Sequence, residues 1–119
     1  MDNISYGVIG EASAVQYLEN KGYHILEKNF RCPLGEIDVI ASDGGTIVFV
    51  EVKHRATLKY GYPAEAVTRF KQNHISRVAA SYIQRKRLYD YPARFDVIEV
   101  LDGKIVNHIE NAFESTVRF

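Results

Sequence analysis

The sequence is poor in several residue types that mark particular protein classes. It has 119 residues but one cysteine, three prolines and no tryptophan. A single cysteine, Cys32, excludes an internal disulfide and a paired-cysteine zinc site, and an unpaired thiol is typical of a reducing compartment. No fully apolar run exceeds Ile47–Val50, far short of the roughly 20 residues that cross a membrane. Residues 1–5 also lack the basic start and apolar run of a secretion signal, so we expect a soluble, cytoplasmic protein with no membrane contact.

Net charge is also lacking, because fifteen basic residues balance fifteen acidic ones. The overall charge therefore gives no support to nucleic-acid binding, and any such function must rest on the local distribution of charge. The 46% of apolar residues and 25% of charged residues are ordinary for a globular protein. With no repeat, linker or low-complexity tract, we expect residues 1–119 to form a single domain.

Hydrophobic periodicity and turn residues predict seven elements of secondary structure. Helical spacing of apolar residues predicts two helices, the second beginning at Pro63, a favoured first residue. Gly-Gly and Asp-Gly pairs between β-rich runs predict two hairpins. The expected helices are 7–21 and 63–87, and the expected strands are 23–30, 36–41, 46–53, 94–101 and 104–110. The order α-β-β-β-α-β-β indicates an α/β protein with a mixed sheet packed by helices.

The first hairpin brings acidic and basic side chains to one face. Glu51 and Lys53 must share a face because side chains alternate along a strand. If Gly44–Gly45 forms the turn, Asp38 lies directly opposite Glu51, with Cβ atoms roughly 4.5–5.5 Å apart. A turn one residue earlier would instead pair Glu36 with Glu51 and leave Asp38 diagonal on the same face. In either register Asp38, Glu51 and Lys53 form one group.

Two opposed carboxylates repel unless a proton or a cation lies between them, and hard divalent ions such as Mg²⁺ suit oxygen ligands. Lys53, one pleat further along, would counter the charge or act on a phosphate. The alternative is that these side chains form a solvated ion-pair cluster on an exposed face of the sheet, which would contribute little to stability. Ile47 and Phe49 precede Glu51 on its own face, so the acids begin where a buried stripe ends. This favours a cleft.

Two more charged residues interrupt apolar stripes. Glu11 lies in the middle of the stripe of the first expected helix, and Lys71 in that of the second. A charge that faces the interior is costly unless it is paired or bound to a metal. Each residue alone is explained by pairing or by a side chain that extends to solvent. Both residues occur in a chain that also carries the group of Asp38, Glu51 and Lys53. This coincidence favours a polar cleft that all of them share.

Basic residues are concentrated in the second helical segment, with no acidic residue between Glu65 and Asp90. Together with two arginines near the hairpin ends they form a candidate phosphate-binding surface. The helix dipole alone also favours basic residues near a helix C-terminus, so both interpretations remain open. The candidate nucleic-acid-binding residues are Arg31, Arg55, Arg69, Lys71 and Arg77.

Several motifs together resemble one known family. They are Gly10–Ala14 (GEASA), Gly35–Ala41 (GEIDVIA), Val48–Arg55 (VFVEVKHR), Lys71 and Arg94–Asp96 (RFD). They resemble the YraN-like family of small bacterial proteins over nearly the whole chain, and the GEID and FVEVK-x-R pair is quite specific. The resemblance implies a restriction-endonuclease-like three-layer core, with a central mixed five-stranded sheet flanked by helices, related to archaeal Holliday junction resolvases.

The resemblance also implies a nuclease site of the PD-(D/E)xK type. Asp38 and Glu51 would bind Mg²⁺ or Mn²⁺, with the Val52 carbonyl as a further ligand and Glu11 completing the metal site. Lys53 would orient or help to deprotonate the attacking water. The expected function is hydrolysis of DNA, with branched or single-stranded DNA as candidate substrates and a homodimer as a candidate assembly. The alternative is a nucleic-acid-binding or adaptor protein that keeps the fold without productive cleavage. Two departures limit the resemblance: Asp38 is not preceded by proline as in the name-giving motif, and we expect no appended DNA-binding module. Substrate preference therefore does not carry over.

Overall fold

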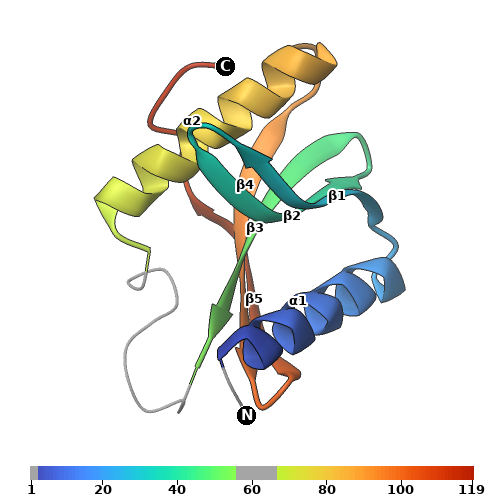
Figure 1. Ribbon diagram of the computed structural model, residues 1–119. Coiled ribbons are helices and arrows are strands. Elements are labelled where there is room, and N and C mark those ends of the chain that lie inside the picture. The colour runs from blue at the N-terminus through green and yellow to red at the C-terminus, as the bar shows by residue number, and fades with distance from the viewer. Residues whose placement is uncertain (1–2, 56–66) are drawn as a thin grey trace.

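The computed structural model describes residues 3–55 and 67–119, with the backbone alone for residues 3–8. The described residues form seven elements in the predicted order α-β-β-β-α-β-β (Figure 1). The elements are α1 (Asn3–Asn20), β1 (His24–Cys32), β2 (Gly35–Asp43), β3 (Thr46–His54), α2 (Arg69–Lys86), β4 (Ala93–Leu101) and β5 (Lys104–Phe113). The expected α/β class is confirmed.

The five strands form one mixed sheet in the order β1-β2-β3-β4-β5. Neighbouring strands are antiparallel except β3 and β4, which are parallel. A parallel pair needs a crossover connection, and the segment that contains α2 supplies it. The sheet therefore has the mixed topology that the sequence predicts.

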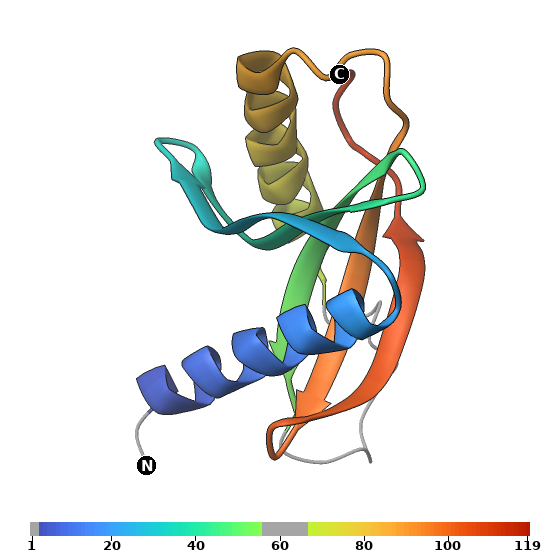
Figure 2. The same cartoon turned by 90° about the vertical axis from the view of Figure 1, so that its right-hand side faces the viewer.

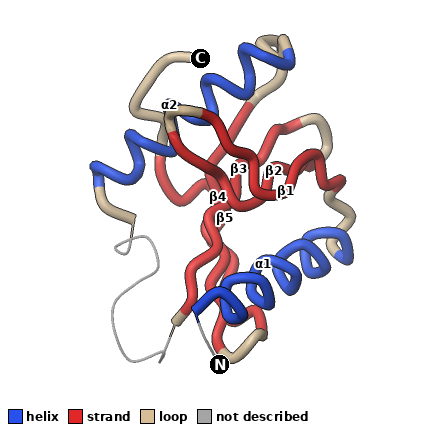
Figure 3. Tube along the Cα trace, in the orientation of Figure 1, coloured by secondary structure: helices blue, strands red, loops and turns tan. Residues whose placement is uncertain are grey.

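One helix covers each face of the sheet, which gives three layers (Figures 1 and 3). The α1 layer packs Ala14, Val15 and Leu18 against apolar side chains of β2, β3 and β4. The α2 layer packs residues such as Val78 and Tyr82 against the opposite side chains of the same strands. β3 is buried on both faces from Ile47 to Val50, as its continuous apolar run predicts. The β1–β2 hairpin curves out between the two helices (Figure 2).

Both outer strands of the sheet are irregular. In β1 the register with β2 shifts between Ile25 and Glu27, and Asn29 has a φ of 51°. In β5 the register shifts twice against β4, and Asn111 has a φ of 53°. Asparagine is one of the few residue types that adopts this left-handed conformation readily. Each outer strand thus contains a register shift and a left-handed asparagine, and in β5 the two coincide because Asn111 lies between Ile109 and Phe113.

A buried polar network joins β4 to β5 on the sheet. Asp96 is wholly buried and accepts hydrogen bonds from Arg94 Nε at 3.0 Å, His108 Nε2 at 2.8 Å and the Asn111 backbone N–H at 3.0 Å. Arg94 also donates to the hydroxyl of Tyr23 at 2.7 Å. A buried carboxylate is tolerated only when it is paired and hydrogen-bonded. These partners meet that condition.

The boundaries of the helices differ from those predicted. α1 begins at Asn3 rather than at residue 7. The predicted start of α2, Pro63, lies outside the described residues, but Thr68 is extended and its side chain accepts the Lys71 backbone N–H at 3.1 Å. Thr68 is thus an N-cap, and a continuous helix from Pro63 is wrong because this cap begins the helix at Arg69. No helix in the described part of the chain is long and apolar enough to span a membrane.

Candidate functional site

The predicted register of the first hairpin is confirmed. Asp43 pairs with Thr46, so Gly44–Gly45 forms the turn, and the regular pairing continues to Val39 opposite Val50. The period of two along each strand then fixes which side chains face each other. The alternative turn, one residue earlier, is excluded.

Regular pairing of β2 and β3 stops just before the acids. Beyond the last pair, the Val52 backbone N–H donates to Asp38 Oδ2 at 2.8 Å. The Asp38 carboxylate therefore satisfies a strand N–H group where β2 no longer supplies a carbonyl. This bond holds the Asp38 carboxylate by Oδ2, close enough to Glu51 for the charge of Glu51 to raise the pKa of Asp38.

Acidic side chains from three elements surround Asp38. Burial is the largest cause that raises the pKa of Asp38 to about 7, and the negative charge of Glu51 is the next. The Val52 N–H opposes the shift, while Glu11 and Glu36 add smaller contributions in the same direction as burial. Burial and the neighbouring acids thus disfavour the ionised form of Asp38. The sequence-predicted acids are brought together.

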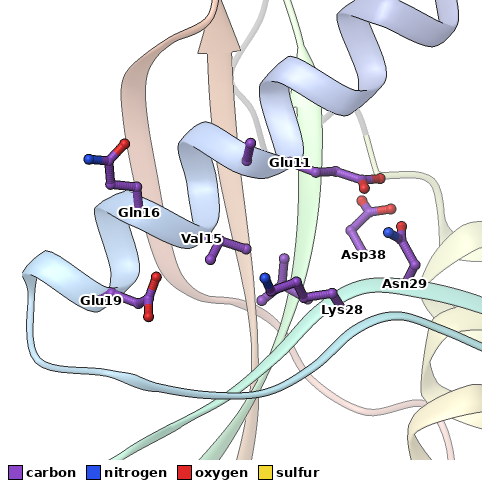
Figure 4. Close-up of a pocket in the computed structure, with 9 residues that line it drawn as sticks. Glu11, Val15, Gln16, Glu19, Lys28, Asn29 and Asp38 are labelled. Atoms are coloured by element: carbon purple, nitrogen blue, oxygen red, sulfur yellow. The ribbon is translucent and has the colours of Figure 1, made fainter.

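Glu11 reaches Asp38 across a cavity between α1 and the β1–β2 hairpin. The cavity has a volume of about 540 Å³, and both acids line it with Asn29. The Glu11 and Asp38 carboxyl groups point toward each other, and the Asn29 amide lies beside Asp38 (Figure 4). Sequence reasoning missed Asn29. An asparagine within a β-rich run, where this residue type is disfavoured, was the available signal.

Two lysines complete the site from the other side. Lys71 Nζ lies 2.6 Å from Glu51 Oε1. Burial lowers the pKa of Lys71, but the hydrogen bond and charge of Glu51 outweigh it and the net shift is upward. Burial and then the positive charge of Lys71 lower the pKa of Lys53. The two lysines are therefore electrostatically unequal, and Lys53 gives up its proton more readily.

The predicted metal ligands do not form a closed cage. In residues 3–55 and 67–119, no three histidine, cysteine or acidic side chains lie at metal-ligand spacing. Glu51 is paired with Lys71 instead, and the Val52 group that contacts Asp38 is its N–H. The acids clustered around Asp38, which raise its pKa together with burial, are nonetheless a feature that suits a divalent cation.

The other predicted residues lie at the margins of this site. Arg31 and Glu36 form an exposed ion pair with an N–O distance of 3.1 Å. Arg55 pairs with Glu99, a buried acid of β4, so its guanidinium is held rather than mobile. The two other candidate phosphate-binding residues, Arg69 and Arg77, are exposed on α2.

Gly35, at the start of β2, allows the hairpin tip to touch α2. Its φ is +141°, and a Cβ atom there would lie 2.4 Å from His74 Nε2. Only glycine combines this backbone conformation with so close an approach. Gly35, the first residue of the GEID motif, thus holds His74 next to the site.

We expect Gly35→Ala to lower the free energy of unfolding by about 1–3 kcal/mol, because it adds backbone strain and a clash with His74. Gly45→Ala is the matched control, since Gly45 has a φ of +90° but nothing within 4 Å of its Cβ position. It should show the cost of strain alone. Urea unfolding of both variants, and of Gly35→Ala/His74→Ala, measures the difference. Equal losses at the two glycines would show that the His74 contact is unimportant.

Comparison with known proteins places the chain in a family. The model of "Uncharacterised protein family UPF0102" matches residues 10–100. A "UPF0102 protein" of Caldicellulosiruptor saccharolyticus is 50% identical over 118 residues, which cover 95% of this chain and 100% of the relative. Another, of Geotalea uraniireducens, is 51% identical over 117 residues, with 95% and 92% covered. These names state no activity. The chain therefore belongs to the uncharacterised protein family UPF0102.

Proposed function

We propose that this protein is a nuclease that hydrolyses phosphodiester bonds of DNA with the help of Mg²⁺ or Mn²⁺. One observation carries the proposal. Acids from α1, β2 and β3 and lysines from β3 and α2 converge where the regular β2–β3 pairing ends. Opposed charges of this kind serve a reaction that binds a cation, activates water and stabilises a phosphate. The resemblance to the YraN-like family supports the same assignment.

The acids fit a divalent cation by their chemistry. Asp38 and Glu51 would hold it, with Glu11 as the third carboxylate. A bound cation would offset the charge of the clustered acids, would lower the pKa of a water molecule and would stabilise charge on the phosphate. Because Glu51 is paired with Lys71, cation binding requires that this ion pair be weakened.

The lysines have separate tasks in this proposal. Lys53, whose pKa is lowered by burial and by Lys71, can orient the attacking water and accept its proton. Lys71, whose pKa is raised, keeps its charge and can donate to a phosphate oxygen once Glu51 turns to the cation. An amine with a lowered pKa beside one that stays charged is a usable acid-base arrangement.

A second candidate is a nucleic-acid-binding or adaptor protein that does not cut. The Lys71–Glu51 ion pair favours it, since a pair of this length neutralises the acid that a cation would need. Binding of DNA without cleavage, undiminished by Glu51→Gln, would support this candidate over the nuclease.

The test is cleavage of labelled duplex, single-stranded and branched DNA in Mg²⁺, Mn²⁺ or EDTA. We expect metal-dependent products from the wild-type protein and rates lower by about 100- to 1,000-fold in Glu51→Gln and Lys53→Met, by analogy with the loss of one charge-stabilising group. Glu36→Gln is the matched control, because Glu36 is exposed and paired with Arg31. It should cut at nearly the wild-type rate. Equal residual cutting by all four proteins would identify a contaminant.

A further inference from the structure

An aromatic side chain projects into solvent at the start of α2. Phe70 is 83% exposed, compared with 59% for Tyr89, the next most exposed large hydrophobic residue in the part of the chain that the structure describes. Isolated exposed apolar residues are common on protein surfaces. Exposure alone therefore assigns no role to Phe70, and its surroundings must decide.

Phe70 is stacked on a second ring. The Phe70 and His74 rings are one helical turn apart, with centroids 6.3 Å apart and an interplanar angle of 18°. His74 is in turn held against the backbone of Gly35 at the hairpin tip. The two rings form a nearly parallel pair in the range of offset stacking, and the outer ring, Phe70, has its surface in water.

This aromatic pair borders the candidate site. His74 lines a cavity of about 230 Å³ together with Asp38, Glu51 and Lys71. Phe70 also lies between two cations in the sequence, Arg69, which is exposed, and Lys71, which is half-buried and paired with Glu51. Aromatic faces beside basic groups that contact the backbone are the usual means of holding unpaired nucleotides.

We propose that Phe70 and His74 form a stacking platform for an unpaired nucleobase next to the phosphate that occupies the acid-lysine site. This inference rests on the proposed function and specifies its substrate class, which is nucleic acid with single-stranded character at the site. Bases inside a duplex are stacked on each other and have no free face to offer, whereas every unpaired base has one.

The experiment measures binding in EDTA, so that it needs neither a metal nor cleavage. Fluorescently labelled oligo(dT) and a blunt duplex of equal length are titrated with wild type, Phe70→Ala, Phe70→Trp and Tyr89→Ala. Loss of one base-stacking contact weakens binding by about 5- to 150-fold. We expect Phe70→Ala to show this loss on the single strand alone, and Phe70→Trp to retain binding. Tyr89→Ala, the control for an exposed aromatic, should match the wild type.

Several outcomes would overturn the platform. They are no binding of oligo(dT) by the wild type, equal loss on single strand and duplex, or a Phe70→Ala variant that binds normally but sediments with a different oligomeric state. The last result would identify Phe70 as a contact between copies of the chain. A wild type that cuts DNA while Phe70→Ala keeps its single-strand affinity refutes the platform and leaves the nuclease standing. The expected binding pattern without any cleavage supports the platform and refutes the nuclease.

Discussion

The Asp38→Asn variant should be more stable than the wild-type protein at pH 8, although it should no longer cut DNA or respond to Mn²⁺. Burial, followed by the charge of Glu51, raises the pKa of Asp38 to about 7. The ionised carboxylate therefore destabilises the fold, and asparagine removes the charge while retaining an oxygen for the Val52 N–H. A buried carboxylate whose charged form costs stability is a candidate for a functional role.

The stability that Asp38→Asn gains over the wild type should increase as the pH rises. The folded protein holds the Asp38 proton up to about pH 7, whereas the unfolded chain loses it near pH 3.9. Between these values the folded state binds more protons, so the wild-type free energy of unfolding falls as pH rises. The stability gained in Asp38→Asn should thus be small at pH 4 and should reach on the order of 2–4 kcal/mol at pH 8.

Urea unfolding at pH 4, 6 and 8 measures this difference, and thermal melts with and without Mn²⁺ measure cation binding. A cation that binds the folded protein alone raises its stability, so the wild-type melting temperature should rise and that of Asp38→Asn should not. Glu36→Gln, which removes an exposed acid of the same group, is the control and should behave like the wild type. A variant that is less stable than the wild type at pH 8 would contradict the electrostatic account of Asp38.

Asp96→Ala should be the most destabilising substitution, with a loss of about 3–5 kcal/mol. Breaking a buried ion pair leaves the remaining charge without compensation, and here Arg94, His108 and the Asn111 N–H all lose their acceptor. Asp43→Asn is the matched control. It removes the other acid that contacts Arg94, at 3.2 Å, but one whose side chain is 41% exposed, and it should cost less than about 1 kcal/mol.

The pKa of Asp96 is shifted in the opposite direction to that of Asp38, so the two residues should make stability depend on pH in opposite directions. Burial alone would raise the pKa of Asp96, but hydrogen bonds from His108, Arg94 and Asn111 outweigh it and lower the pKa. The stability from its charge is therefore complete above the unfolded value near pH 3.9 and is lost as pH falls toward the lower folded pKa. Acid unfolding monitored by circular dichroism should begin at higher pH in Asp96→Ala. An unchanged acid transition would show that Asp96 contributes no such stability.

Local sequence signals were sufficient for the architecture and for the acidic half of the site. Gly44–Gly45 fixes a two-residue turn, and the alternation of side chains then places Asp38 and Glu51 together without reference to the rest of the fold. Glu11 and Lys71 were identifiable because each interrupts an apolar stripe. The turn, the alternation and the interrupted stripes all involve residues that are close in sequence, so the pattern of a single hairpin or helix is enough to predict them.

The remaining features depend on residues that are distant in sequence. The partners of Asp96 come from β4 and β5, and Arg94 in turn donates to Tyr23; no periodicity within β4 indicates these contacts. The contact between Gly35 and His74 joins the hairpin tip to α2. The start of α2 was misplaced because Pro63 is a favourable first residue, whereas the Thr68 side chain provides the N-cap. The Lys71–Glu51 pair likewise required the packing of α2 over the sheet.

The irregularities of the two outer strands affect how the protein behaves at high concentration. An open sheet exposes unpaired N–H and C=O groups along its two outer strands, and these can recruit further strands and start fibrils. Left-handed residues and register shifts in β1 and β5 interrupt the straight ladder that such recruitment needs. Self-association of this chain by continuous sheet propagation is therefore disfavoured.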